Sequence, residues 1–303
     1  MRVCAVDIGT NSVRTIVADV RAPCLVEVVR YDGRITRLGE GLGESNSLKA
    51  QAIERTVRVV KDHVEHGRRM GPRAFKLVAT SAARKAGNGA HLLQAIHDAA
   101  AVAAEIVTGE REAQLVLAGV RAGGMLGETP ALVVDVGGGS TELIACAGAG
   151  PPDIQSFNIG AVNLTEQFLK TDPPTQEEMN AASSAAGQLP GSALGDCKAI
   201  DLVGLGGTIT TMAAMLQQLH EYDPAAVHGT RLTLDETRDL LSRAASLPLD
   251  ERKQLPGLSA ARADIIVAGM ILVQAVFAAA NHDEMRVCTT GILHGVALAA
   301  AHE

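Results

Sequence analysis

One short pattern, an apolar run followed by an aspartate and a tight turn, occurs twice in the 303-residue chain. The copies are Val6-Asp7-Ile8-Gly9-Thr10-Asn11-Ser12 and Val134-Asp135-Val136-Gly137-Gly138-Gly139-Ser140. They align without a gap, so that Asp7 falls on Asp135, Gly9 on Gly137 and Ser12 on Ser140. Because β-branched residues precede and follow each turn, each copy predicts a β-hairpin. A repeat of this kind predicts two halves built on a shared structural unit.

Both turns have the composition of a phosphate-binding loop. Glycine lacks a Cβ, so backbone N–H groups can approach an anion closely, and hydroxyl groups add further donors. The predicted phosphate-binding residues in the two turns are Gly9, Thr10, Asn11, Ser12, Gly137, Gly138, Gly139, Ser140 and Thr141. A tight hairpin turn without a ligand is the alternative.

Carboxylates beside these turns predict a metal site. Asp135 is anionic and does not bind phosphate itself, but it can hold Mg2+, directly or through water, or orient an attacking water. We therefore expect Mg2+ as the cofactor and Asp135 as a ligand and catalytic residue. Asp7 and Glu142 are the other candidate ligands.

A third glycine-rich segment follows another apolar run. Residues 200–203 predict a strand, and Gly204-Leu205-Gly206-Gly207-Thr208 leads from it into a predicted helix over residues 209–219. A helix N-terminus that follows glycines is a ready anion site, so Gly206, Gly207 and Thr208 are phosphate-binding candidates. Close packing of strand and helix is the alternative.

The composition argues against nucleic acid and membrane as partners. The net charge is −7, aromatic residues make up 2% of the chain and Trp is absent, so base-stacking platforms are not expected. No apolar run reaches membrane-spanning length. The five scattered cysteines and the immediate start of a strand without a signal peptide predict a reduced, cytoplasmic protein.

A polyanionic substrate would need local positive charge against this acidic background. The candidates are Arg14, Arg34, Arg84, Lys85 and Arg111, with a solvated surface position as the alternative for each.

Several segments together resemble one family. They are Asp7 to Arg14, Ala79 to Arg84, Gly109 to Ala113, Asp135 to Leu143 and Gly204 to Thr208, in that order. The chain resembles the exopolyphosphatase and guanosine pentaphosphate phosphohydrolase (Ppx/GppA) family in its short two-domain form. This family belongs to the actin, sugar kinase and Hsp70 ATPase superfamily.

The resemblance implies an α/β fold. Two duplicated lobes of the actin-like ATPase, or ribonuclease H-like, type are expected, each a mixed sheet flanked by helices, with a cleft between them. Residues 1–124 would form the N-terminal lobe, joined by a C-terminal helix at about 296–303. Residues 125–295 would form the C-terminal lobe.

The resemblance also implies residue roles. The family's proposed catalytic glutamate falls on Glu112, and its arginine near the cleft falls on Arg84, which adds Arg84 to the phosphate-binding candidates. The alternative for Glu112 is a favourable charge at a helix N-terminus. Two positions depart from the family pattern: Arg111 stands where a glutamate is usual, and Leu293 stands where many relatives carry arginine.

The activity that the resemblance implies is hydrolysis of terminal phosphoanhydride bonds of inorganic polyphosphate, with release of orthophosphate. Two alternatives stay open: a guanosine pentaphosphate (pppGpp) 5′-phosphohydrolase and a sensor that binds polyphosphate or an alarmone without turning it over. A sugar or acid kinase fits the motifs less well. A homodimer is also expected by resemblance.

Overall fold

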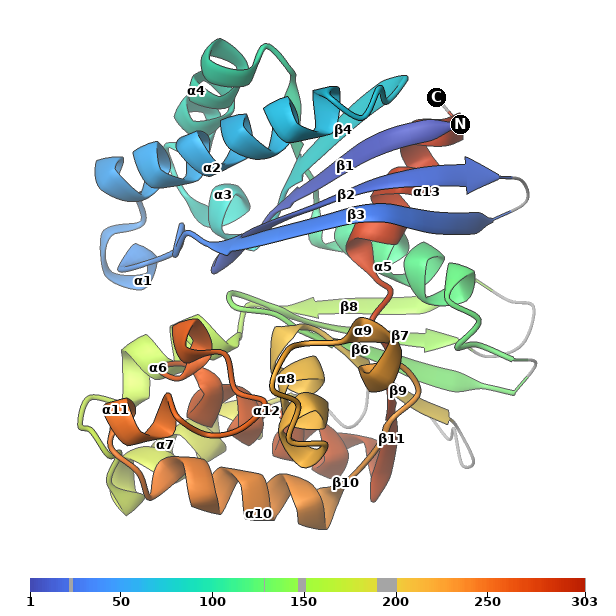
Figure 1. Cartoon of the computed structure of the whole chain (residues 1–303). Helices are drawn as coiled ribbons and strands as arrows, with labels where there is room; N and C mark the ends of the chain where they lie inside the picture. Colours follow the sequence, from blue (N-terminus) through green and yellow to red (C-terminus); the bar gives the residue numbers. More distant parts are fainter. Residues whose placement is uncertain (22–23, 128, 147–150, 190–200, 303) are drawn as a thin grey trace. The chain divides into compact units, whose positions relative to one another are not determined.

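The computed structural model describes residues 1–303 except 22–23, 128, 147–150, 190–200 and 303 (Figure 1). The chain folds into two compact units. The first contains Met1–Gly124 and Thr290–Glu303, and the second contains Met125–Thr289. That these units act as the two functional lobes stays a prediction.

The first unit is built on a five-stranded sheet in the order β3-β2-β1-β4-β5. β1 pairs antiparallel with β2 and parallel with β4. The strands are β1 (Arg2–Ile8), β2 (Ser12–Arg21), β3 (Leu25–Ile35), β4 (Ala74–Ala79) and β5 (Ala104–Ile106). The sequence alone predicts two strands, near residues 25–31 and 34–38, but in the structure β3 runs through Gly33 without a break.

Helices cover both faces of this sheet (Figure 1). Cys4, Val6 and Ile8 alternate along β1 and pack with residues of α2 and α4, whereas Val3 and Ala5 are buried on the opposite face, where α13 contacts β1. This alternation follows from the two-residue period of a strand. The helices are α1 (Leu42–Ser45), α2 (Ala50–Arg68), α3 (Ser81–Lys85), α4 (Gly89–Ala100), α5 (Gly109–Ala122) and α13 (Ile292–His302).

The N-terminus of α2 lies later than the sequence alone predicts. Ser47 is a plausible N-cap for a helix that begins at Leu48, but α2 begins at Ala50 after Lys49, without a side-chain cap. The Asn88 amide instead bonds to both the N–H (2.8 Å) and the carbonyl (3.0 Å) of Leu48. This distant side chain fixes Leu48 in an extended segment, so the helix starts later.

α5 and α13 pack backbone to backbone. A Cβ on Gly119 would lie 2.6 Å from the carbonyl carbon of Gly291, and one on Gly295 would lie 2.6 Å from the carbonyl carbon of Leu115. Such distances exclude any side chain at either glycine without movement of the helices. The last helix of the chain therefore fixes α5, the helix that carries Glu112.

The second unit has a six-stranded sheet in the order β10-β11-β9-β6-β7-β8. Its strands are β6 (Ala131–Val136), β7 (Thr141–Cys146), β8 (Asp153–Phe157), β9 (Asp201–Leu205), β10 (Arg231–Thr233) and β11 (Glu284–Val287). Its helices are α6 (Ala161–Phe168), α7 (Gln176–Ala186), α8 (Gly207–Leu216), α9 (Pro224–Val227), α10 (Leu234–Ala245), α11 (Leu249–Arg252) and α12 (Ile266–Ala280), with a 3-10 turn at Ala260–Arg262. Ten residues of α12 are buried, as expected for a core helix.

The two sheets repeat one connectivity. The order β8-β7-β6-β9-β11 matches β3-β2-β1-β4-β5, with antiparallel pairs before the central strand and parallel pairs after it. The first hairpin opposes Asp7 to Arg14, and the second opposes Asp135 to Glu142. These are the positions that the gapless alignment equates, so the predicted duplicated hairpins are confirmed.

None of the helices described here combines the length and the apolar character needed to cross a bilayer. The cytoplasmic location stays a prediction. Cys4 and Cys288 are buried and Cys24 is exposed, while Cys197 lies outside the described residues.

Candidate phosphate and metal site

The same backbone hydrogen bond closes both hairpin turns. Gly9 N–H donates to the Ser12 carbonyl at 2.9 Å, and Gly137 N–H donates to the Ser140 carbonyl at 3.0 Å. These two N–H groups are therefore occupied inside the turns, and neither glycine serves a phosphate through its N–H. Their part is to shape the turn, where a Cβ on Gly137 would lie 2.9 Å from the Ser140 oxygen.

In the second unit, the carbonyls of the glycine turn point into the N-terminus of α6. Gly137 and Gly138 accept hydrogen bonds from Ala161 (3.0 Å) and Val162 (2.8 Å), and the Gly139 carbonyl accepts from the Asn163 amide (3.1 Å). In a planar trans peptide, the N–H points opposite to the carbonyl. The N–H groups of Gly138 and Ser140 therefore point away from α6, which is the arrangement that an anion-binding turn needs.

Thr141 does not fit its predicted role. Its side chain is fully buried, and its hydroxyl donates to the Ile159 carbonyl at 2.7 Å. The hydroxyl thus fixes the neighbouring loop, and its proton is not available to a phosphate.

The carboxylates of the two hairpins have different partners. Asp7 is 2% exposed, and its Oδ2 accepts hydrogen bonds from Nε (3.0 Å) and Nη2 (2.6 Å) of Arg14, directly across the strand pair. This ion pair gives Asp7 a protein cation and gives Arg14 a carboxylate partner, while their predicted roles as metal ligand and phosphate-binding residue stay predictions. At the equivalent positions of the second hairpin, Asp135 faces Glu142, and both residues are acidic.

The Asp135–Glu142 pair fits a divalent cation. Directly opposite residues of an antiparallel pair lie on one face of the sheet, and like charges there are destabilising. Glu142 is 2% exposed, and its Oε1 accepts a hydrogen bond from Ser156 Oγ at 2.8 Å. Two hard carboxylate donors suit Mg2+. Among the described residues, no cluster of three or more His, Cys, Asp or Glu side chains is placed to hold a metal, so water or phosphate oxygens would complete the coordination.

The α8 N-terminus adjoins Asp135. Gly206 has φ +98°, and a Cβ there would lie 2.7 Å from Asp135 Oδ1, so only glycine fits between the strand and the carboxylate. A Cβ on Gly207 would lie 2.5 Å from Nη2 of Arg262 and closer still to Nη1. The structure therefore places an arginine, an aspartate and a helix N-terminus around two adjacent glycines. Arg262 was not among the predicted site residues, because the sequence indicated a structural role for it, pairing with Asp264 or capping a helix.

The side chain of Thr208 packs between two helices. It is 4% exposed, and a Cβ on Gly269 of α12 would lie 2.7 Å from its methyl group and closer still to its hydroxyl. Phosphate binding by Thr208 stays a prediction, and its backbone N–H at the α8 N-terminus is the group that could serve it.

In the first unit, α5 presents Glu112 next to Arg84. Thr108 caps the helix by accepting a hydrogen bond from Arg111 N–H at 3.1 Å, which places Glu112 in the first turn. Glu112 is 9% exposed, and its Oε2 accepts from Arg84 Nη1 at 2.8 Å. Arg84 Nη1 also donates to the Val107 carbonyl at 2.9 Å, so the guanidinium is fixed in place. Arg84 therefore orients the carboxylate that the family resemblance singles out.

Neither departure from the family pattern disturbs this pair. Arg111 is exposed, and its Nη1 donates to Gln114 at 3.3 Å rather than to Glu112. Leu293 is 6% exposed and belongs to the packed face of α13.

Two buried polar atoms near the first turn lack a hydrogen-bond partner. They are Nδ2 of Asn11, which is 8% exposed, and Oγ of Ser81, which is 2% exposed. Thr80 N–H donates to the Ile8 carbonyl at 3.1 Å, so Ser81, the residue after Thr80, lies close to the end of β1. Buried polar groups are normally satisfied, and a phosphate oxygen would satisfy such donors. Ser81 was not among the predicted phosphate-binding residues, because a Thr-Ser pair after a strand can either cap a helix or face a cleft, and the sequence alone does not decide between the two.

Two α/β units of one connectivity, each with a turn suited to phosphate, define a protein of the actin-like ATPase fold class. The sequence profile of the Ppx/GppA phosphatase family matches residues 16–303. The chain belongs to this family. The predicted family membership and fold class are thereby confirmed.

Individual relatives match over the whole chain. Exopolyphosphatase 2 of Mycobacterium tuberculosis is 34% identical over 325 aligned residues, which cover 99% of this chain and 98% of that protein. The crystal structure of the Aquifex aeolicus Ppx/GppA family member is 31% identical with a TM-score of 0.80, covering 100% of this chain and 98% of that one. The crystal structure of an exopolyphosphatase-like protein is 28% identical with a TM-score of 0.89, covering 98% and 97%.

Proposed function

We propose that this protein is an exopolyphosphatase that hydrolyses the terminal phosphoanhydride bond of inorganic polyphosphate and uses Mg2+. The observation that carries the proposal is the contrast between the two hairpins. The first contains the built-in ion pair Asp7–Arg14, whereas the second opposes Asp135 to Glu142, two carboxylates that suit a divalent cation. Full-length similarity to a protein named exopolyphosphatase supports the choice of substrate.

In the proposed reaction, Glu112 takes a proton from the attacking water. The water oxygen bonds to the terminal phosphorus, the bridging P–O bond breaks, and the shortened chain leaves as orthophosphate forms. Arg84 keeps the carboxylate of Glu112 oriented toward the water. Bound Mg2+ would neutralise charge on the phosphate oxygens.

Each unit by itself offers donors suited to phosphate oxygens. The second unit supplies the N–H groups of Gly138 and Ser140, the α8 N-terminus and the guanidinium of Arg262. The first supplies Asn11 Nδ2 and Ser81 Oγ, whose burial without a partner would be relieved by a phosphate oxygen.

Removal of the 5′-phosphate of pppGpp is the second candidate, because it breaks the same kind of bond. The small number of aromatic residues and the exposure of both tyrosines favour polyphosphate over pppGpp as the substrate. The chain has two Tyr and four Phe, and Tyr31 (56%) and Tyr222 (53%) are exposed, so they offer no buried platform for a guanine base. The homodimer expected from the resemblance is part of this proposal.

Orthophosphate release from long-chain polyphosphate, short-chain polyphosphate and pppGpp, each with Mg2+, tests the proposal. Glu112→Gln should lower kcat by about 10²–10⁴-fold, the contribution typical of a general base. Glu110→Gln is the matched control, because Glu110 lies in the same first turn of α5 but is exposed. Faster turnover of pppGpp would favour the second candidate, and binding without release from any substrate would favour the sensor.

A further inference from the structure

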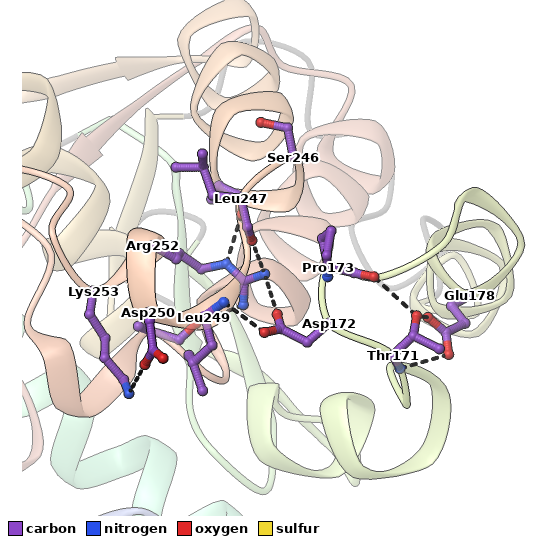
Figure 2. Close-up of polar contacts among 12 residues, drawn as sticks. Thr171, Asp172, Pro173, Glu178, Ser246, Leu247, Leu249, Asp250, Arg252 and Lys253 are labelled. Carbon is purple, nitrogen blue, oxygen red and sulfur yellow. Dashed lines mark hydrogen bonds and ion pairs between the residues drawn. The ribbon is translucent and has the colours of Figure 1, made fainter.

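A buried guanidinium joins four segments of the second unit. Arg252, at the end of α11, is 4% exposed (Figure 2). Its Nε donates to the Ala244 carbonyl at 2.7 Å, and its Nη1 donates to the Ala263 carbonyl at 3.1 Å. Its Nη2 donates to the Leu247 carbonyl at 2.7 Å and to Asp172 Oδ1 at 3.2 Å. A buried charge is tolerated only when it is paired and hydrogen-bonded as fully as this one.

Asp172 holds both the arginine and the helix that carries it. While Oδ1 accepts from Arg252, Oδ2 accepts from the N–H of Leu249, the first residue of α11, at 2.7 Å. The segment around Asp172 is itself anchored, because Thr171 N–H donates to Glu178 at 3.0 Å (Figure 2). The Asp172 carboxylate thus links the α6–α7 connection to α11 through two hydrogen bonds.

A single residue, Ala263, connects the Arg252 guanidinium to Arg262, one of the proposed phosphate-binding residues. Ala263, whose carbonyl binds Arg252, directly follows Arg262. The 3-10 turn that ends at Arg262 also bonds Arg262 N–H to the Ser259 carbonyl at 2.8 Å. From this turn the Arg262 guanidinium extends over Gly207 at the α8 N-terminus. Any shift of Ala263 therefore moves the base of the Arg262 side chain.

We propose that Arg252, held by Asp172, is a positioning residue that fixes Arg262 over the N-terminus of α8. This inference rests on the proposed function insofar as Arg262 binds phosphate. An arginine side chain has many rotamers, so holding its backbone in place lowers the entropy lost when the guanidinium binds an anion. The role of Arg252 is exerted through Arg262, and Arg252 does not itself touch the substrate.

Asp172→Asn is the sharpest perturbation. The amide keeps the shape of the carboxylate, but whichever way it turns, its NH2 group faces a donor, either Arg252 Nη2 or Leu249 N–H. The matched control is Asp250→Asn, which removes the Asp250–Lys253 ion pair (2.9 Å) on the exposed side of the same helix (Figure 2). Arg252→Lys is the second variant, because it keeps the charge but loses the branched set of donors.

Two measurements test the inference. The first is steady-state kinetics on polyphosphate, where Asp172→Asn and Arg252→Lys should raise KM about tenfold and leave kcat within about twofold, since an anion contact is misplaced but the reacting groups are not. In an Arg262→Ala background, Asp172→Asn should have no further effect on KM. The second is the rate at which phenylglyoxal modifies Arg262 in the folded protein, followed by mass spectrometry, which should rise in Asp172→Asn and stay at the wild-type rate in Asp250→Asn.

The outcomes separate the two proposals. Wild-type protein that releases no phosphate from any substrate removes the proposed function, and the phenylglyoxal rates still decide the placement of Arg262. An unchanged Arg262 rate in Asp172→Asn overturns the inference. An equal KM effect of Asp172→Asn with and without Arg262 also overturns it, because a general loss of structure would act in both backgrounds.

Discussion

Replacing Gly119 with alanine tests whether the contact between α5 and α13 holds the first unit together. A Cβ there would lie 2.6 Å from the carbonyl carbon of Gly291 and closer still to its oxygen. The obstacle is backbone, which has no rotamer to change. The two segments would have to separate by roughly 1 Å to restore a carbon–carbon distance of ~3.5 Å.

Two effects of opposite sign determine how much Gly119→Ala changes the free energy of unfolding. In a helix without neighbours, alanine stabilises relative to glycine by about 1 kcal/mol. Overpacking costs about 1–3 kcal/mol, and the upper end applies here because backbone must move. The expected net loss is about 2 kcal/mol in the free energy of unfolding, which corresponds to a fall of roughly 8 °C in the Tm of a unit of this size.

Circular dichroism on heating measures this change. Gly43→Ala is the control, because Gly43 lies in α1 and a Cβ there would meet nothing within 4 Å. The control should melt at or slightly above the wild-type temperature. Because α5 carries Glu112, phosphate release by Gly119→Ala should also fall at temperatures where the protein remains folded. A Gly119→Ala protein that melts together with the wild type would refute the reasoning.

Three further predictions concern titration, thiol reactivity and metal binding. Burial lowers the pKa of His63 below its ordinary 6.5, so the unfolded chain binds a proton that the folded chain does not. The urea midpoint of unfolding should therefore fall as the pH drops below about 6.5, and a His63→Gln variant should lack this part of the pH dependence. Burial raises the pKa of Cys4 to about 12, so a thiol reagent at pH 8 should label exposed Cys24 and leave Cys4 intact in the folded protein; equal labelling would contradict this. Glu142→Gln should raise the Mg2+ concentration for half-maximal phosphate release at least about tenfold, and an unchanged Mg2+ dependence would remove Glu142 as a ligand.

The sequence predicted the fold best where local signals agree with tertiary structure. The two hairpins were predictable because β-branched runs flank a short turn in both copies. The α7 N-terminus was predictable because Thr175 and Glu178 form a capping box within four residues. The N-terminus of α2 was not, because Asn88 fixes the residue before it from forty positions away.

The site was predicted less completely, since its polar partners come from distant positions. The candidates Asp7 and Arg14 were both identified, but their pairing depends on the register of the hairpin, which the turn hydrogen bond sets. The packing of the Thr208 side chain against Gly269 was not predicted, because it joins two helices far apart in the chain. The contact of Arg262 with Gly207 was not predicted for the same reason.

The split first unit has a consequence for biosynthesis. The helix with Glu112 is complete when residue 122 has been made, but its packing partner α13 begins only at Ile292. At ~5–20 residues per second, synthesis of the intervening Met125–Thr289 takes on the order of ten seconds. During that interval the nascent chain can fold its second unit while the first still waits for its last helix. The proposed hydrolase should therefore gain activity only once α13 has been synthesised, and nascent chains that have not reached Ile292 should leave polyphosphate uncleaved.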